Sequence, residues 1–227
     1  MTSRDAILQR IGKGLANAAA AGSAGLAPPP VSEVWPCDHA SHGARSDPQA
    51  LAQRFADELA AVHGQTIRSG TMSEARRQLA ELLDTAGWPT LGALDRPLVR
   101  EVTAELPAGR LAWIQPDAQA RSIAELPAGL LTAECLLADT GTCVIACPTA
   151  ADRLMCYLPP ACVVVARREQ LVEHLPAAWA ELSKRCTDPQ ASGELVLVTG
   201  PSRTSDIEKV LILGVHGPMR LVVLLVG

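Results

Sequence analysis

The residues best suited to chemistry lie close together in a polar segment near the end of the sequence, residues 200–218. This segment is rich in glycine, proline, hydroxyl groups and charges, and it lies between two apolar runs at residues 195–199 and 221–226. Short apolar runs bounded by turn residues are typical of buried strands. Because binding and catalytic residues are often found in loops carried by rigid strands, we expect this segment to take part in the function.

The first half of the segment has the pattern of a helix start that binds an anion. Ser205 and Glu208 have the spacing of a capping box, which favours a helical turn after the first apolar run. A helix that starts after a parallel strand presents unpaired amide groups, which suit a phosphate or a carboxylate, and Arg203 can add a bidentate contact. The alternative is a capped helix in which Asp206 and Glu208 only complement the helix dipole, but we favour the ligand site. The candidate ligand-binding residues are Gly200, Pro201, Ser202, Arg203 and Thr204.

The second half of the segment contains a single histidine, His216, followed by Gly217 and Pro218. An imidazole can act as a general acid or base near neutral pH, and neighbouring glycines allow a ligand to approach the backbone closely. A loop histidine that makes one hydrogen bond explains the same pattern equally well. We therefore treat His216 and Asp206 as candidate catalytic residues and Gly217 as a candidate binding residue.

A second polar turn, at residues 138–142, joins two further apolar runs. Gly141 can adopt a positive φ, and the hydroxyl and amide groups of Thr140 and Thr142 can hold an anion. From the residues alone we favour a plain turn, because the side chains of Asp and Thr commonly satisfy local backbone groups in such patterns. Asp139 is kept as a third candidate catalytic residue, and Thr140, Gly141 and Thr142 as candidate binding residues.

The elements that must carry these residues alternate between helices and short apolar runs. The pattern predicts helices over residues 47–62, 73–85 and 169–184. It predicts strands in the apolar runs at residues 65–68, 111–114, 130–138, 142–146, 161–166, 195–199 and 221–226. Strands this apolar need cover on both faces, which indicates an α/β sandwich with a mainly parallel sheet.

The N-terminal part of the chain has a different character. Apolar residues at helical spacing predict an amphipathic helix over residues 4–19, and a connector rich in proline and glycine follows it. We expect an N-terminal appendage over residues 1–46 and an α/β domain over residues 47–227.

Composition excludes two classes of partner. The 227 residues carry a net charge of −4 and only one Phe and one Tyr, so the chain lacks both the basic footprint and the stacking side chains of a nucleic-acid-binding protein. The longest apolar runs are far shorter than the roughly 20 residues that span a bilayer, and charged residues interrupt any N-terminal leader. We expect a cytoplasmic protein that does not insert into membranes.

Seven cysteines raise the question of a metal or an iron–sulfur cluster. No two have the C-x-x-C spacing of zinc ribbons or ferredoxin clusters, and most lie in apolar runs, where thiols act as small hydrophobic side chains. The sequence also lacks the glycine-rich fingerprint of dinucleotide-binding proteins and the common hydrolase and metalloprotease motifs. We therefore expect no bound metal and no cofactor.

The polar segments belong to longer motifs that resemble a known family. These motifs read LADTGTCVIAC, YLPPACVVV and TGPSRTSDIEKVLILGVHGP, after an opening RDAILQRIGKGLA. Together and in this order they closely resemble the lactate-utilisation protein C family, also called the LUD domain or LutC/YkgG family. The resemblance implies a three-layer α/β/α sandwich similar to the sugar-phosphate isomerase and CoA-transferase fold. It also implies a role in the bacterial oxidation of L-lactate to pyruvate together with iron–sulfur partner proteins.

Two hypotheses for function remain open at this point. In the first, the chain is a non-redox component of a lactate-oxidising complex that binds a small carboxylate or phosphate ligand or helps to assemble the iron–sulfur subunits. In the second, it is a stand-alone isomerase or acyl/CoA-transferase-like enzyme that uses His216 with Asp206 or Asp139. A CoA transferase would also require a reactive glutamate, for which Glu134 is the nearest candidate, although no motif supports it.

Overall fold

The computed structural model describes residues 47–187, 193–204, 212–213 and 217–227. The helix and connector expected over residues 1–46 lie outside these residues, and so do the candidate catalytic residues Asp206 and His216. Within the described ranges, no helix is both long enough and apolar enough to cross a membrane.

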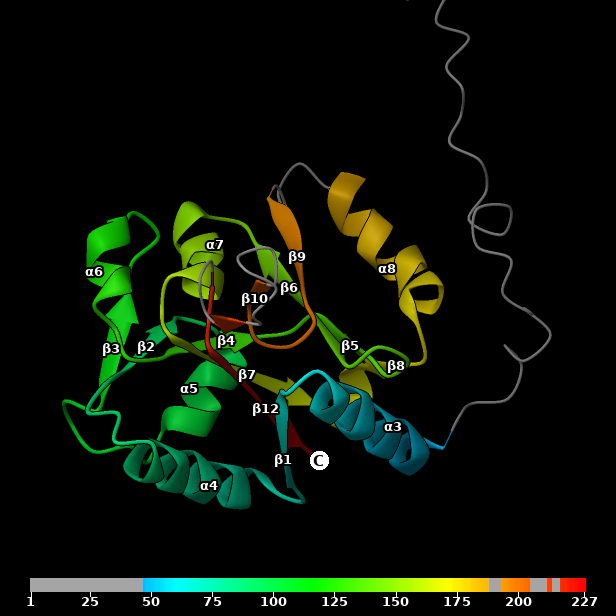
Figure 1. Cartoon of the computed structure of the whole chain (residues 1–227), viewed down its shortest axis with the longest axis horizontal. Helices are drawn as coiled ribbons and strands as arrows, with labels where there is room; N and C mark the ends of the chain where they lie inside the picture. Colours follow the sequence, from blue (N-terminus) through cyan, green and yellow to red (C-terminus); the bar gives the residue numbers. More distant parts are fainter. Residues whose placement is uncertain (1–46, 188–192, 205–211, 214–216) are drawn as a thin grey trace, which may run out of the picture. The chain divides into compact units, whose positions relative to one another are not determined.

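A six-stranded parallel sheet forms the centre of the described domain (Figure 1). Every neighbouring pair in it runs parallel, which confirms the mainly parallel sheet expected from the sequence. In spatial order the strands are β1 (Gln65–Ser69), β12 (Arg220–Val226), β7 (Ala161–Arg167), β4 (Gly129–Thr132), β2 (Leu91–Leu94) and β3 (Leu111–Ile114).

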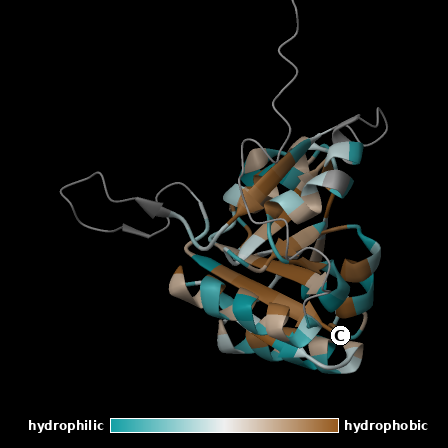
Figure 2. Ribbon diagram, turned by 90° about the vertical axis from the view of Figure 1, so that its right-hand side faces the viewer, coloured by the Kyte–Doolittle hydropathy of each residue, from teal (hydrophilic) through white to brown (hydrophobic). Residues whose placement is uncertain are grey.

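Helices cover both faces of this sheet because its central strands are apolar on both sides. Along β12, Val222 and Leu224 face a core shared with α4 (Met72–Thr85) and α5 (Pro97–Thr103). The alternate residues Leu221 and Val223 face the other core, which is shared with helices on the opposite side. Those helices are α3 (Pro48–Ala61), α6 (Ala120–Ala124) and α7 (Ala150–Tyr157). Figure 2 shows the central strands mostly in the hydrophobic colour, whereas the helices carry both colours.

A second, four-stranded sheet adds to the three layers expected. Its order is β8 (Leu171–Val172), β5 (Cys135–Leu137), β6 (Thr142–Cys147) and β9 (Glu194–Val198). The β5–β6 and β6–β9 pairs are antiparallel, and the β5–β8 pair is parallel. One face of this sheet joins the core that contains α3 and α7, and the other packs against α8 (Leu175–Thr187).

Two helices begin where the sequence predicts them, because a polar side chain caps each one. The Asp47 carboxylate accepts a hydrogen bond from the amide of Gln49 at 3.1 Å, and Pro48 occupies the first turn of α3. Thr71 caps α4 through a 3.2 Å bond from the amide of Glu74. These bonds satisfy amide groups that a helix start leaves unpaired.

Two predicted elements differ in the structure, and several short elements were not predicted. The apolar run at residues 130–138 is divided between β4 and β5, which lie in different sheets. The helix predicted over residues 169–184 begins only at Leu175, after a short 3-10 turn (Arg168–Gln170) and β8. The sequence analysis also missed β2, α5, α6 and α7, which are only four to eight residues long. Short elements are stabilised mainly by tertiary packing, so their local pattern is weak.

Candidate functional site

Several of the predicted binding residues come together at one junction of the structure. Thr142 begins β6 and Thr199 follows β9, and their hydroxyl oxygens lie 2.6 Å apart. The hydroxyl of Thr140 lies 2.8 Å from that of Thr142 and donates to the Asp139 carboxylate at 3.3 Å. A chain of hydroxyl groups therefore joins the Asp139 turn to Thr199, the residue before the 200–218 segment. We call Thr140, Thr142 and Thr199 together the threonine junction.

Two glycines at the threonine junction press against the end of α3. Gly141 has a φ of 62°, and a Cβ at this position would lie 2.4 Å from the amide nitrogen of Leu59. Gly200 has a φ of 87°, and a Cβ there would lie 2.9 Å from the carbonyl oxygen of Val62. Both the backbone conformation and the close approach of the helix require glycine. The two glycines are therefore explained first by the close packing of their loops against the end of α3.

The two ends of the 200–218 segment also meet. The amide of Ser202 donates to the carbonyl of Pro218 at 2.8 Å, and Gly217 lies beside the Ser202 side chain. Pro201 is buried. Arg203–Thr204 forms strand β10, which pairs antiparallel with β11 (Ile212–Leu213). The expected capping box at Ser205 and Glu208 lies outside the described residues.

The setting of this segment differs from the one predicted. We expected a parallel strand before Gly200 and a helix start at the carboxyl edge of the sheet, but β9 runs antiparallel to β6 in the second sheet. The segment then re-enters the parallel sheet at the amino end of β12, where the amide of Met219 donates to the carbonyl of Pro160 at 2.8 Å. An apolar run does not reveal which sheet it joins, so the sequence could not separate these arrangements.

The carboxyl edge of the parallel sheet holds a different site, which the sequence analysis missed. A cavity of about 480 Å³ lies where β2 and β3 end and α7 begins. We call it the arginine pocket, and its polar and aromatic lining includes Arg96, Arg100, Trp113, Gln115, Thr149 and Asp152. The available signal was the Asp-Arg pair directly after Leu94, but the run before it is short and contains a glycine.

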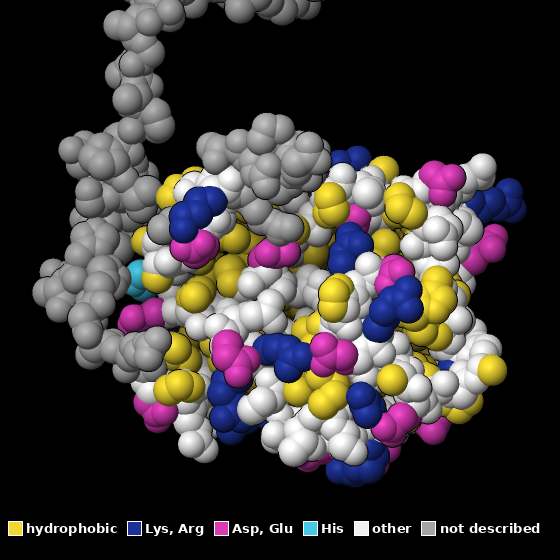
Figure 3. All heavy atoms as spheres, turned by 180° about the vertical axis from the view of Figure 1, so that it is seen from behind, with side chains coloured by type: hydrophobic (Ala, Val, Ile, Leu, Met, Phe, Trp, Pro, Cys, Tyr) yellow, Lys and Arg dark blue, Asp and Glu magenta, His cyan; other side chains and the backbone are white. Residues whose placement is uncertain are grey.

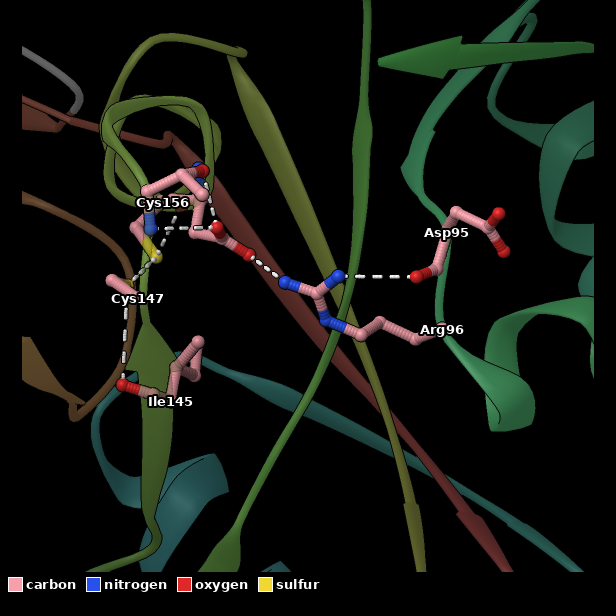
Figure 4. A network of polar contacts seen from close by, with 7 residues as sticks. Asp95, Arg96, Ile145, Cys147 and Cys156 are labelled. Atoms are coloured by element: carbon pink, nitrogen blue, oxygen red, sulfur yellow. Dashed lines mark hydrogen bonds and ion pairs between the residues drawn. The ribbon is translucent and has the colours of Figure 1, made fainter. Parts of the chain in front are cut away.

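Buried Asp152 orients one of the two arginines of the pocket. Its side chain is 3% exposed, and one oxygen accepts a 2.5 Å bond from Arg96. The other oxygen accepts from the amide and the hydroxyl of Thr149 at 3.0 and 2.5 Å, completing the capping box of α7. Figure 4 shows Arg96 extended between Asp95, whose carbonyl it also contacts at 3.0 Å, and this network. The buried carboxylate is fully hydrogen-bonded, as a buried charge requires.

The second arginine, Arg100, is held by Asp95 and Trp113. Its guanidinium donates to both carboxylate oxygens of Asp95 at 2.5 and 2.6 Å, and it lies 5.4 Å from the centre of the Trp113 ring. The hydrogen bond from Arg100 lowers the pKa of Asp95, and the same bond raises the pKa of Arg100. Both groups therefore stay ionised at neutral pH, with the guanidinium exposed at the mouth of the pocket.

Charge on the rest of the visible surface is mixed. Figure 3 shows basic and acidic side chains interspersed over the face seen from behind. Surface ion pairs join charged side chains of the described residues, such as Arg77 and Glu81 at 2.8 Å. On this face, selection of an anion would depend on individual arginines and not on a broad basic surface.

A pair of buried thiols extends the network behind the pocket. The sulfur atoms of Cys147 and Cys156 lie 3.8 Å apart, and the Cys156 thiol contacts the Asp152 carbonyl at 3.4 Å (Figure 4). The hydrogen bond between the two thiols lowers the pKa of Cys147 and raises the pKa of Cys156. Burial raises the pKa of Cys135 to about 11 and that of Cys162 to about 12. In the part of the chain that the structure describes, no three His, Cys, Asp or Glu residues are grouped to hold a metal.

The fold places the protein in the class of α/β proteins with a central parallel sheet covered by helices on both faces. The LUD domain family matches residues 52–226, and the chain therefore belongs to this family, as its motifs indicated. A DUF162 family protein from Deinococcus radiodurans has a similar fold, with a TM-score of 0.54 and 18% identity over 80% of this chain and 99% of that one.

Several curated relatives carry the name Lactate utilization protein C. The protein from Bacillus pumilus is 34% identical over 91 residues, which are 40% of this chain and 38% of that protein. The protein from Halalkalibacterium halodurans is 32% identical over 97 residues, 40% of each chain. The match thus spans about two fifths of the length of these relatives.

The first prediction concerns Gly141. We expect Gly141→Ala to lower the free energy of unfolding by about 3 kcal/mol or more, because the new Cβ adds overpacking against Leu59 to the cost of a left-handed backbone. Gly87→Ala is the matched control, since Gly87 has a φ of 67° and open space around it, and we expect a loss of only about 1 kcal/mol. Urea unfolding of both variants tests this, and equal losses would contradict close packing at Gly141.

The second prediction concerns the buried carboxylate. We expect Asp152→Ala to lower the free energy of unfolding by about 2–3 kcal/mol, because it removes a helix cap and a charge-assisted bond to Arg96. Glu81→Ala, which breaks an exposed pair on α4, should cost less than about 0.5 kcal/mol. Chemical denaturation compares the two, and a loss at Asp152 as small as that at Glu81 would show that the network contributes little.

The third prediction concerns thiol reactivity. Thiolates are the reactive species, so thiols with a raised pKa stay protonated and unreactive near pH 8. All five cysteines that the structure describes are buried, so we expect slow alkylation of the native protein, with Cys147 ahead of Cys135 and Cys162 because its pKa is lowered and theirs are raised. Mass spectrometry of the native protein after timed alkylation at several pH values measures the order. Faster labelling of Cys162 than of Cys147 would contradict it.

Proposed function

We propose that this protein is a component of a bacterial L-lactate utilisation system and acts with iron–sulfur partner proteins in the oxidation of L-lactate to pyruvate. The observation that carries the proposal is the similarity to relatives named Lactate utilization protein C, together with the LUD domain match over residues 52–226. The proposal includes the cytoplasmic location expected from the sequence.

In this proposal the chain binds a small anionic ligand and does not itself carry electrons. Two groups of residues support a binding role. The threonine junction gathers hydroxyl groups from two loops, with Thr142 and Thr199 in direct contact. The arginine pocket offers two guanidinium groups at the carboxyl edge of the parallel sheet, the edge at which open α/β sheets commonly bind ligands.

The hypothesis of a stand-alone isomerase or acyl transferase gains less support. It depends on His216 and Asp206, which lie outside the described residues, and on Asp139. The Asp139 carboxylate accepts a hydrogen bond from Thr140, and its backbone amide donates to the carbonyl of Glu173 at 3.0 Å. Both contacts are typical of a residue that stabilises a turn.

The fourth prediction tests the role in lactate utilisation. In the bacterium that encodes this protein, we expect an in-frame deletion of its gene to abolish growth on L-lactate and to leave growth on pyruvate unchanged, because only the oxidation step is lost. Adding the purified chain to extracts of the deletion strain should restore lactate-dependent reduction of an electron acceptor. Normal growth of the deletion strain on L-lactate would overturn the proposal.

Association with iron–sulfur proteins is measured in the same strain. An affinity-tagged copy that restores growth should co-purify with proteins that contain iron and acid-labile sulfide. If the active chain is recovered without such proteins, under conditions that keep extracts active, the proposed association with iron–sulfur partners is wrong, although the role in lactate utilisation can still stand.

A further inference from the structure

We propose that the arginine pocket binds a small organic carboxylate of the 2-hydroxy or 2-oxo acid type. The class of acid rests on the proposed function in lactate utilisation, whereas the place of binding rests on the geometry of the pocket. The pocket lies on the opposite edge of the parallel sheet from the amino end of β12, where the polar 200–218 segment re-enters the sheet.

The arginines keep donors available for a ligand. A guanidinium has five N–H groups. Arg96 uses one for the Asp95 carbonyl and one for the Asp152 carboxylate, and Arg100 uses two for the Asp95 carboxylate. Among the contacts of the described residues, three N–H groups on each arginine are therefore left for a ligand. Such forked donors match the geometry of a carboxylate.

The existing ion pairs hold these donors in position. Asp152 is buried and bonded to Thr149, so it fixes the end of Arg96, while the stacked Trp113 ring and the Asp95 fork restrain Arg100. A site whose groups are already ordered loses less conformational entropy when the ligand binds. The two aspartates also offset the positive charge, so recognition depends on directed hydrogen bonds more than on net potential.

The remaining lining suits an acid with a second oxygen and an apolar part. Gln115 carries an amide that can donate to or accept from an oxygen at the 2-position. Trp113, which is 41% exposed, and Ile114 form an apolar wall beside the arginines. At about 480 Å³ the cavity falls within the usual range for ligand sites and exceeds the size of a three-carbon acid. We therefore expect a larger 2-hydroxy acid with an aromatic side chain to bind at least as tightly as L-lactate.

The fifth prediction is a binding experiment on the purified full chain. Ligand-detected NMR and tryptophan fluorescence are recorded with L-lactate, pyruvate, phenyl-lactate, propionate and inorganic phosphate. We expect the first three to bind, and propionate, which lacks the 2-oxygen, to bind several-fold more weakly. Arg100→Gln should weaken binding at least tenfold, and Trp113→Phe should remove the ligand-induced fluorescence change.

Arg77→Gln is the matched control. Arg77 is 63% exposed and pairs with Glu81, and Arg100 is 64% exposed and pairs with Asp95, but Arg77 lies on α4 away from the pocket lining. This variant should bind L-lactate as the unchanged protein does.

Arg96→Gln is a further test of the same site. Because it removes the ion pair of Arg96 with the buried Asp152, the fold of this variant is first checked by circular dichroism. Arg100 and Trp113 do not contact Asp152 in the described hydrogen bonds, so their variants test the site even where Arg96→Gln fails to fold.

Three outcomes would overturn the inference. They are no carboxylate binding by the unchanged protein, equal binding by the Arg100→Gln and Arg77→Gln variants, and binding of phosphate as tight as that of L-lactate. The growth experiment separates this result from the proposed function. If the deletion strain loses growth on L-lactate but the unchanged chain binds no carboxylate, or binds it equally after Arg100→Gln, the pocket inference fails and the pathway role stands. If the deletion strain grows normally on L-lactate but the pure chain binds it through Arg100, the pathway role fails and the pocket stands.

Discussion

The burial of the parallel sheet on both faces is the constraint on which the rest of the structure depends. Strands such as β7 and β12 carry apolar side chains at every buried position, so each face needs its own layer of helices. Parallel strands also give the sheet two chemically different edges. The polar segments that mark the family meet at the amino edge and in the second sheet, whereas the arginine pocket opens at the carboxyl edge.

Local chemistry explains which parts of this fold could be predicted from the sequence. Asp47 and Thr71 cap their helices with their own side chains, and the apolar runs of β7 and β12 are long enough to be recognised alone. The direction and sheet membership of β9 depend on its pairing with β6, more than forty residues earlier in the chain, and no local pattern records such a pairing. Only the resemblance to a family indicated that the Asp139 turn and the 200–218 segment are related.

The same reasoning applies to the candidate sites. The threonine junction brings the Asp139 turn to the residue that precedes the 200–218 segment, through the contact of Thr142 with Thr199. Yet Gly141 and Gly200 are explained by the close approach of α3, so a distinctive motif can reflect packing as well as binding. The arginine pocket has no such motif, because its residues come from three separate parts of the chain around Arg96, Trp113 and Asp152. Sequence reasoning finds residues that are close in the chain more readily than residues that are close only in space.

The start of α7 links stability to the proposed chemistry. Thr149 and Asp152 satisfy each other and the first amides of the helix, which makes the buried carboxylate a rigid acceptor. Arg96 then reaches this fixed acceptor from the end of β2, while its side chain remains 36% exposed. The capping box that stabilises the start of α7 therefore also orients a guanidinium at the edge of the sheet where ligands commonly bind. In the proposed site, removal of Asp152 would disturb binding through the position of Arg96.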